Sequence, residues 1–285
     1  MCSCYCCNKR LSLRRVITKR LSTISSFCLL LLCSKLNANI NEYFFYKVQP
    51  SSSNYGNTGL LEIPNARFMN PASLKLGISS SYPNEFTYLT ATPFPWLEAS
   101  YRYIEIKDKK YGPARYSGNQ SFKDKGFDIK IGLVNETRLM PAIAFGLRDI
   151  AGTGLYSSEY IVASKRIGNF DVTTGLGWGL LGSANNTSNP FKTFGSRFDN
   201  RTRLESSEGG EIGNKKWFTG NTAILGGIEY NLNKYGLRFK LEYDTSKPFE
   251  NGKVKIKPKT NFNFGFNYYP YEWLNLGAAY ERGNQ

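Results

Sequence analysis

The chain contains no histidine, and its six cysteines lie close to the N-terminus. They are Cys2, Cys4, Cys6, Cys7, Cys28 and Cys33. If export removes this part of the chain, neither thiol nor imidazole remains. That loss excludes Cys nucleophiles, disulfides, His general bases and zinc sites with nitrogen or sulfur ligands. A catalytic mechanism that uses only carboxylates is still possible, but mechanisms that need a cysteine, a histidine or a zinc ion bound by them are not. We therefore predict a protein that is not an enzyme and uses no cofactor or metal.

Long apolar runs are also missing beyond the N-terminal stretch, although 41% of the residues are hydrophobic. No run approaches the roughly 18 apolar residues of a membrane-spanning helix. This excludes a polytopic helical membrane protein. It does not exclude a transmembrane β-barrel, because only every second residue of a barrel strand faces lipid.

Basic residues outnumber acidic ones, and the formal net charge is +15. Residues 1–38 contribute seven bases and no acids, which leaves 30 basic against 22 acidic residues in the remainder. The remaining bases are scattered among acids, whereas a nucleic-acid binder gathers them on one face. We predict no nucleic-acid partner.

The first 38 residues have the order of a secretory signal peptide with a long basic front. A basic region (residues 9–20) precedes an apolar stretch (residues 24–33), and Leu36-Asn37-Ala38 offers a small-residue cleavage end. The early cysteine cluster holds a single C-x-x-C and would be discarded with the signal, so it does not indicate a metal site. A lipid anchor at Cys33 is poorly supported, because Leu31 and Leu32 precede it where small residues are required.

Beyond this signal, apolar and polar residues alternate with a period of two, which is typical of strands with one apolar and one polar face. Residues 237–243 (LRFKLEY) and 127–133 (FDIKIGL) are clear examples. The pattern predicts eleven strands, at residues 72–80, 85–92, 95–106, 126–135, 141–150, 157–167, 169–182, 222–231, 236–244, 260–268 and 273–281. We expect residues 39–71 to form an extended N-terminal segment and residues 72–285 to form the β domain.

The connections between these strands alternate in length. The even-numbered ones are tight, and the odd-numbered ones are mostly long and polar, with residues 183–221 the longest. Short turns on one side and long loops on the other are typical of a barrel inserted from the periplasm. Aromatic residues such as Phe94, Trp96, Tyr271 and Trp273 gather at the short-turn ends, as in the aromatic girdles of barrels. A soluble carbohydrate-binding β-sandwich is the alternative fold.

Two patterns resemble functional sites. Residues 175–182 contain a G-x-G-x-x-G, but a polar loop follows instead of a helix, so strand glycines at a bend or close approach explain it better than a nucleotide site. Charged residues on the strands predict a polar track in the barrel lumen, made of Lys123, Asp124, Asp128, Lys130, Arg148, Asp149, Glu159 and Lys165. Structural ion pairing between neighbouring strands is the simpler interpretation, and a track for a charged or hydroxylated polymer is the functional one. Asp149 and Glu159 also supply the two carboxylates that a glycosidase requires.

Several stretches resemble the YjbH family of exopolysaccharide- and capsule-associated outer-membrane proteins. They are residues 57–68, 95–98, 121–130 and, above all, 141–182 (PAIAFGLRDIAGTGLYSSEYIVASKRIGNFDVTTGLGWGLLG). The resemblance implies an outer-membrane β-barrel that works with an exopolysaccharide secretion operon, and it carries over no catalytic or binding residues. Family members are usually longer and often have lipoprotein signals.

Together these observations predict an all-β, antiparallel outer-membrane β-barrel of about 11–12 strands. Because bacterial barrels have even strand numbers, an eleven-strand chain is expected either to be truncated at its C-terminus or to close through other residues such as 42–50. The expected function is to assist exopolysaccharide or capsule export or surface assembly, with outer-membrane lipid, the polymer and other secretion-operon proteins as partners. An exported carbohydrate-active enzyme and a surface adhesin acting through residues 183–221 are the alternatives.

Overall fold

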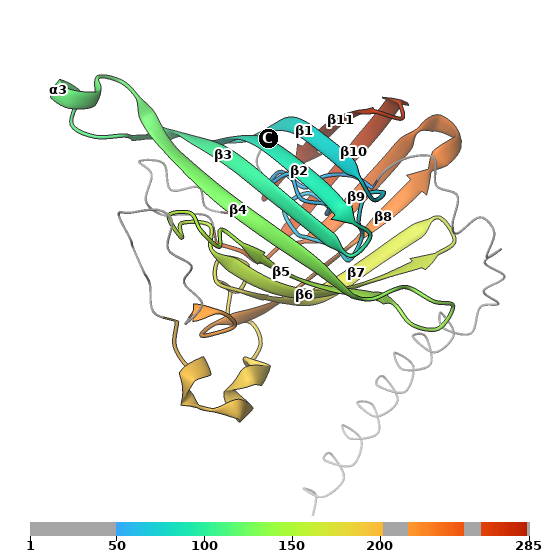
Figure 1. Cartoon of the computed structure of the whole chain (residues 1–285). Helices are drawn as coiled ribbons and strands as arrows, with labels where there is room; N and C mark the ends of the chain where they lie inside the picture. The colour runs from blue at the N-terminus through green and yellow to red at the C-terminus, as the bar shows by residue number, and fades with distance from the viewer. Residues whose placement is uncertain (1–49, 202–215, 248–257, 284–285) are drawn as a thin grey trace, which may run out of the picture. The chain divides into compact units, whose positions relative to one another are not determined.

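The computed structural model describes residues 50–201, 216–247 and 258–283. Its dominant feature is one antiparallel sheet in which each strand pairs with the next along the chain (Figure 1). The eleven strands are β1 (Ser73–Ser81), β2 (Asn84–Phe94), β3 (Leu97–Lys110), β4 (Ser121–Val134), β5 (Ala142–Arg148), β6 (Ser158–Ile167), β7 (Phe170–Trp178), β8 (Thr222–Leu232), β9 (Leu237–Tyr243), β10 (Phe262–Tyr271) and β11 (Leu274–Tyr280). The eleven predicted strands and the antiparallel all-β class are thereby confirmed.

The largest differences in strand bounds have local causes. β4 begins at Ser121, earlier than predicted, because the β3–β4 hairpin continues pairing as far as Lys110 and Ser121. A single helical turn, α3 (Ala114–Ser117), closes that hairpin. β7 ends at Trp178, earlier than predicted, because Gly179 adopts a φ of 64° that breaks the extended backbone.

The remaining helical elements are short 3-10 turns. They are η1 (Pro190–Phe194), η2 (Ser196–Phe198) and η4 (Asn233–Tyr235). Within the described ranges, no helix is long and apolar enough to cross a membrane.

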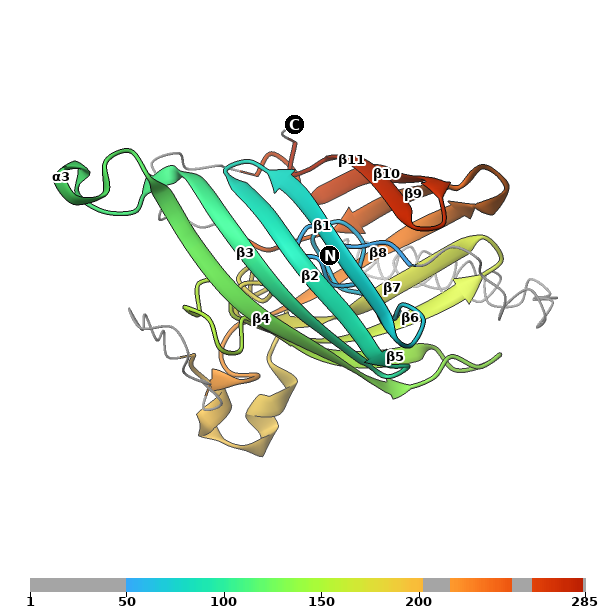
Figure 2. The same ribbon diagram turned by 45° about the horizontal axis from the view of Figure 1, so that its top comes forward.

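The sheet curves around residues 51–69, which we call the inner segment (Figures 1 and 2). This segment contacts strands near both edges of the sheet. Thr90 Oγ1 on β2 donates to the Gly56 carbonyl at 2.9 Å, and Lys240 Nζ on β9 donates to the Leu60 carbonyl at 2.7 Å. One short segment can reach strands so far apart in the sheet only because the sheet curls around it.

The hydrophobic core lies between the inner segment and the concave face of the sheet. Leu60, Ile63 and Ala66 pack with inward residues of the central strands and with Leu181. The partners on the strands are Ala142, Ala144, Tyr160, Val162 and Leu225. A second cluster joins Tyr55 to Phe86, Ile104, Ile106 and Tyr156.

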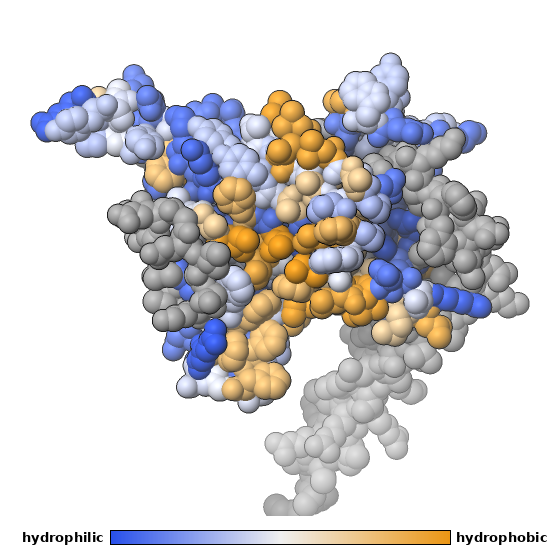
Figure 3. All heavy atoms as spheres, viewed as in Figure 1, coloured by the Kyte–Doolittle hydropathy of each residue, from blue (hydrophilic) through white to orange (hydrophobic). Residues whose placement is uncertain are grey.

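The convex face of the sheet is apolar and exposed. Cross-strand pairing aligns Ile228, Leu241 and Phe264 in one row over β8, β9 and β10, and these side chains are 39%, 47% and 55% exposed. In Figure 3, hydrophobic side chains cover the middle of the visible face, whereas the tip of the β3–β4 hairpin is hydrophilic. The burial pattern is thus inverted relative to a water-soluble sheet, with charges inside and aliphatic side chains outside.

The two edge strands, β1 and β11, each pair on one side only among the described strands. They approach each other at one end, where Ser81 Oγ donates to Glu281 Oε2 at 2.7 Å. We call the gap between them the seam. The described strands therefore form one curved sheet and do not close through backbone pairing.

Candidate functional site

Buried charges line the concave face, and most of the predicted track residues are among them. Asp124, Asp128 and Lys130 alternate along β4 with outward residues, and each is at most 5% exposed. Arg148 and Asp149, at the end of β5, are also buried.

Two of these residues form ion pairs between neighbouring strands. Lys130 Nζ lies 3.0 Å from Glu98 Oε1 on β3, and Asp128 contacts the Arg102 guanidinium, also on β3. Arg102 is fully buried. Such pairs are stable only when further hydrogen bonds satisfy the remaining polar atoms.

The inner segment supplies many of those hydrogen bonds through its backbone. Glu242 on β9 accepts from the amides of Leu61, Glu62 and Ile63 at 2.9–3.3 Å. Lys130 Nζ donates to two carbonyls of the segment, those of Thr58 and Arg67. Buried carboxylates thus take its N–H groups, and buried lysines take its carbonyls.

Side-chain contacts fix both ends of the inner segment. The Arg67 guanidinium forms a bidentate salt bridge with the Asp171 carboxylate on β7, with both N–O distances 2.8 Å. It also lies 2.5 Å from the Glu136 carboxylate. Near the start, Ser51 Oγ donates to Glu229 Oε2 on β8 at 2.9 Å. The charged inner face therefore holds the inner segment in place.

Three predicted track residues, Lys123, Glu159 and Lys165, lie at outward positions of their strands. Lys123 pairs across strands with Glu105, in register with other outward residues. Lys165 donates to carbonyls of the β4–β5 turn and lies 3.4 Å from Glu136. The prediction that they face the interior is wrong, because each is offset by one residue from the buried alternates of its strand.

Asp149 and Glu159, the candidate glycosidase pair, have different partners. Asp149 accepts from the Tyr156 amide at 3.0 Å, and its burial raises the pKa of this carboxyl to about 6. The Arg201 guanidinium of the β7–β8 connection donates to both carboxylate oxygens of Glu159, at 2.6 and 2.8 Å. The Phe218 amide donates to the same carboxylate. Glu159 therefore anchors that connection to the sheet.

The glycines of the G-x-G-x-x-G pattern lie in β7 and in the turn that follows it. A Cβ on Gly175 would lie 2.3 Å from the Ile161 carbonyl oxygen, and one on Gly177 would lie 2.6 Å from Leu181 Cβ. Gly175 therefore lies against the backbone of the neighbouring strand β6, and Gly177 lies against Leu181 in the turn after β7.

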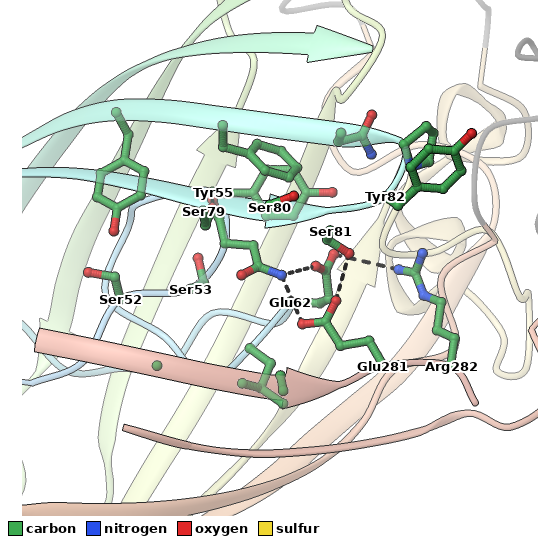
Figure 4. A pocket seen from close by; sticks show the side chains of 18 of the residues that line it. Ser52, Ser53, Tyr55, Glu62, Ser79, Ser80, Ser81, Tyr82, Glu281 and Arg282 are labelled. Atoms are coloured by element: carbon green, nitrogen blue, oxygen red, sulfur yellow. Dashed lines mark hydrogen bonds and ion pairs between the residues drawn. The ribbon is translucent and has the colours of Figure 1, made fainter. Parts of the chain in front are cut away.

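A cavity of about 690 Å³ lies along the seam, and we call it the seam cavity. Its walls come from the inner segment, the β1–β2 hairpin, β10, β11 and the residues just after β11. At its centre, Asn54 Nδ2 donates to two carboxylates, Glu62 Oε1 at 2.6 Å and Glu281 Oε1 at 2.8 Å. Figure 4 shows the side chains of Glu62 and Glu281 near each other and near Ser81.

The electrostatics of this centre depend on the two adjacent carboxylates. Burial, and then the charge of Glu62, raise the pKa of Glu281 to about 8. Arg282 lies 3.6 Å from Glu62 and binds Asp244 at 2.8 Å. The Glu281 carboxyl therefore takes up a proton at a higher pH than an exposed glutamate does.

Sequence reasoning missed the seam cavity. Asn54, Glu62, Ser81 and Glu281 are far apart in sequence and show no motif. Only the curvature of the sheet and the path of the inner segment bring them together.

Comparisons with known proteins agree with the resemblance noted in the sequence. The family described as "Exopolysaccharide biosynthesis protein YbjH" (YjbH) matches residues 51–285. The chain is 38% identical over 240 residues to the "Uncharacterized lipoprotein YjbH" of Escherichia coli (strain K12), an alignment that covers 83% of this chain. It spans only 34% of that relative's length. No solved structure matches the chain. The match over nearly all of the described sheet shows that this chain belongs to the YjbH exopolysaccharide family.

Proposed function

We propose that the chain is a non-enzymatic outer-membrane β-barrel protein that assists the export or surface assembly of an exopolysaccharide. The observation that carries the membrane part is the inverted burial pattern. Exposing a row such as Ile228, Leu241 and Phe264 to water would be costly, whereas lipid is a good solvent for it.

The connections and aromatics support the same placement. The tight β2–β3, β4–β5, β6–β7, β8–β9 and β10–β11 turns leave one end of the sheet, and the long β3–β4, β7–β8 and β9–β10 connections leave the other. At the tight-turn end, Phe94 stacks on Trp96 and Tyr271 stacks on Trp273, each pair with ring centroids 5.6 Å apart. Exposed aromatic rings are typical of the level of the lipid headgroups.

The polymer part of the proposal comes from the family, whose description names exopolysaccharide biosynthesis. The relative is named a lipoprotein, which supports export and membrane association for this chain. The polar seam cavity and the charged inner face give such a protein a water-compatible interior.

The test combines localisation with a polymer assay. Cells that express the chain are fractionated, and the outer membrane is analysed by electrophoresis with and without heating. We expect the protein in the outer-membrane fraction, with a mobility that changes on heating, and we expect its deletion to lower the amount of surface polymer. A soluble protein without heat-modifiable mobility would contradict the membrane part. Unchanged surface polymer would contradict the exopolysaccharide part.

A further inference from the structure

The seam cavity has the size and chemistry of a ligand site. Its volume of about 690 Å³ falls within the range of roughly 300–1,000 Å³ that is usual for small-molecule pockets. Such pockets combine aromatic walls with a few convergent polar groups. Here the buried rings of Phe86 and Tyr156 form an aromatic part of the cavity wall, and the Tyr82 ring, which also lines the cavity, is exposed.

Many polar groups of the cavity are uncharged and can form hydrogen bonds with an uncharged ligand. Serine hydroxyls come from the inner segment and from β1, including Ser53 and Ser79, and the amides of Asn54, Asn267 and Asn275 are present as well. Together with the Glu62 and Glu281 carboxyls, they offer donors and acceptors at short spacing. This mixture matches the adjacent hydroxyls of a sugar ring, each of which both donates and accepts.

A buried acceptor in the cavity wall, Asn267 Oδ1, has no hydrogen-bond partner among the described residues. Asn267 is 7% exposed, and its Nδ2 donates to Asn275 Oδ1 at 2.9 Å. A buried acceptor that stays unpaired is unfavourable, so a ligand hydroxyl that donates to it would be bound favourably.

The charged groups of the cavity disfavour an acidic ligand. Glu62 and Glu281 lie at its centre, Asp108 lies in its wall, Arg282 is held by Asp244, and Lys240 is held by the Leu60 carbonyl. Of the other two bases that line the cavity, Lys109 places its Nζ 3.9 Å over the Phe122 ring, and Lys247 is exposed. At the centre, a uronate or pyruvate carboxylate would therefore meet the Glu62 and Glu281 carboxyls, while Arg282 and Lys240 are already held by Asp244 and Leu60.

We propose that the seam cavity binds an uncharged, hydroxyl-rich stretch of the exopolysaccharide, with Asn267 and the Asn54–Glu281 pair contacting sugar hydroxyls. This inference rests on the proposed function for the identity of the polymer. It adds to that function a binding site and a class of sugar residue.

The test measures oligosaccharide binding by the full chain in detergent. Exopolysaccharide from the bacterium that encodes the chain is partially hydrolysed and separated into neutral and acidic oligosaccharides by anion exchange. Calorimetry is then performed on the native protein, on Asn267→Leu and on the matched control Asn231→Leu. Asn231 is an equally buried inward amide on β8 that lies outside the cavity.

We expect the neutral fraction to bind, Asn267→Leu to weaken binding about tenfold, and Asn231→Leu to leave it within twofold of native. If Asn267→Leu fails to fold, Ala279→Trp provides a second variant, because Ala279 lines the cavity from the exposed edge strand β11. Trp there should abolish binding.

Binding of the acidic fraction alone would overturn the site, and so would neutral binding that neither variant changes. No binding by a native protein that passes the fractionation and polymer tests would also overturn it, and would leave the proposed function standing. Failure in those two tests would instead remove the proposed function itself.

Discussion

At the scale of single residues, the buried charges of this chain are structural groups with specific partners. Lys130 is 1% exposed, lies 3.0 Å from Glu98, and donates to two carbonyls of the inner segment. Replacing such a pair by apolar residues can be nearly neutral, but removing one partner leaves an uncompensated buried charge. The simpler interpretation of these charges, ion pairing between strands, describes Lys130 and Asp128 well.

Glu98→Gln should therefore destabilise the protein by about 3–5 kcal/mol, because the Lys130 charge loses its counterion in a buried site. Urea unfolding in detergent micelles measures the change. Glu105→Gln is the matched control, because Glu105 lies on the outward face and pairs with the exposed Lys107. We expect the control to unfold close to the native urea midpoint, because exposed ion pairs contribute little to stability. Equal effects of the two variants would contradict the structural role of the buried pair.

Glu281 gives the protein a predictable pH dependence. Its folded pKa of about 8 exceeds the ordinary value of 4.5, so the folded state holds this proton more tightly than the unfolded state does. The stabilisation is fully present below about pH 4.5 and is lost progressively as the pH rises to about 8.

Glu281→Gln should flatten the stability profile between these two pH values, because glutamine cannot ionise. The measurement is the urea midpoint of native and variant protein from pH 5 to 9. Identical pH slopes for the two proteins would show that Glu281 does not carry the proton.

At the scale of elements, the inner segment and the sheet depend on each other. The segment has few backbone hydrogen bonds of its own, so the inward side chains of the strands satisfy its amides and carbonyls. In return, the backbone of the segment supplies hydrogen-bond partners to buried charges of the strands such as Lys130 and Glu242.

Glu242→Gln tests this dependence, because the carboxylate accepts from three consecutive amides of the segment. An amide side chain has one acceptor oxygen and would direct donors at some of the same N–H groups. We expect faster cleavage within residues 51–69 during limited proteolysis, while the sheet stays intact. Glu85→Gln, at an outward carboxylate 51% exposed, should cleave at the native rate. Native-like cleavage of Glu242→Gln would argue that apolar packing alone holds the segment.

At the scale of the whole molecule, the question is whether water or lipid surrounds the convex face, and charged substitutions on that face distinguish the two. Leu241 stands in the middle of the outward apolar row, whereas Leu139 is 87% exposed in the β4–β5 turn. In water, both positions would tolerate a charged side chain. In a bilayer, only the turn position would, because the cost depends on depth.

Leu241→Arg should therefore destabilise the membrane-inserted protein by about 2–4 kcal/mol and reduce its heat-modifiable form. Leu139→Arg should behave like the native chain. Refolding into lipid vesicles followed by electrophoresis with and without heating measures both variants. Equal tolerance of the two substitutions would favour a water-soluble sheet.

How far the sequence predicts this structure depends on the range of the interactions. Strand alternation is a local property, so residues 127–133 and 237–243 revealed their strands directly. Side-chain direction is less secure, because a strand shifted by one residue exchanges its faces. In the structure Lys123 and Lys165 lie at outward positions of their strands, whereas Asp128 and Lys130 lie at inward ones.

The sequence by itself determined the antiparallel class, the eleven strands, the tight turns and the family, because each follows from residue order or short-range periodicity. Only the tertiary structure decided what fills the concave side and where a ligand could lie. Asn54, Glu62 and Glu281 come together because the sheet curls until its edges approach, and curvature is a sum over many strand pairings. No local pattern in the sequence records that sum.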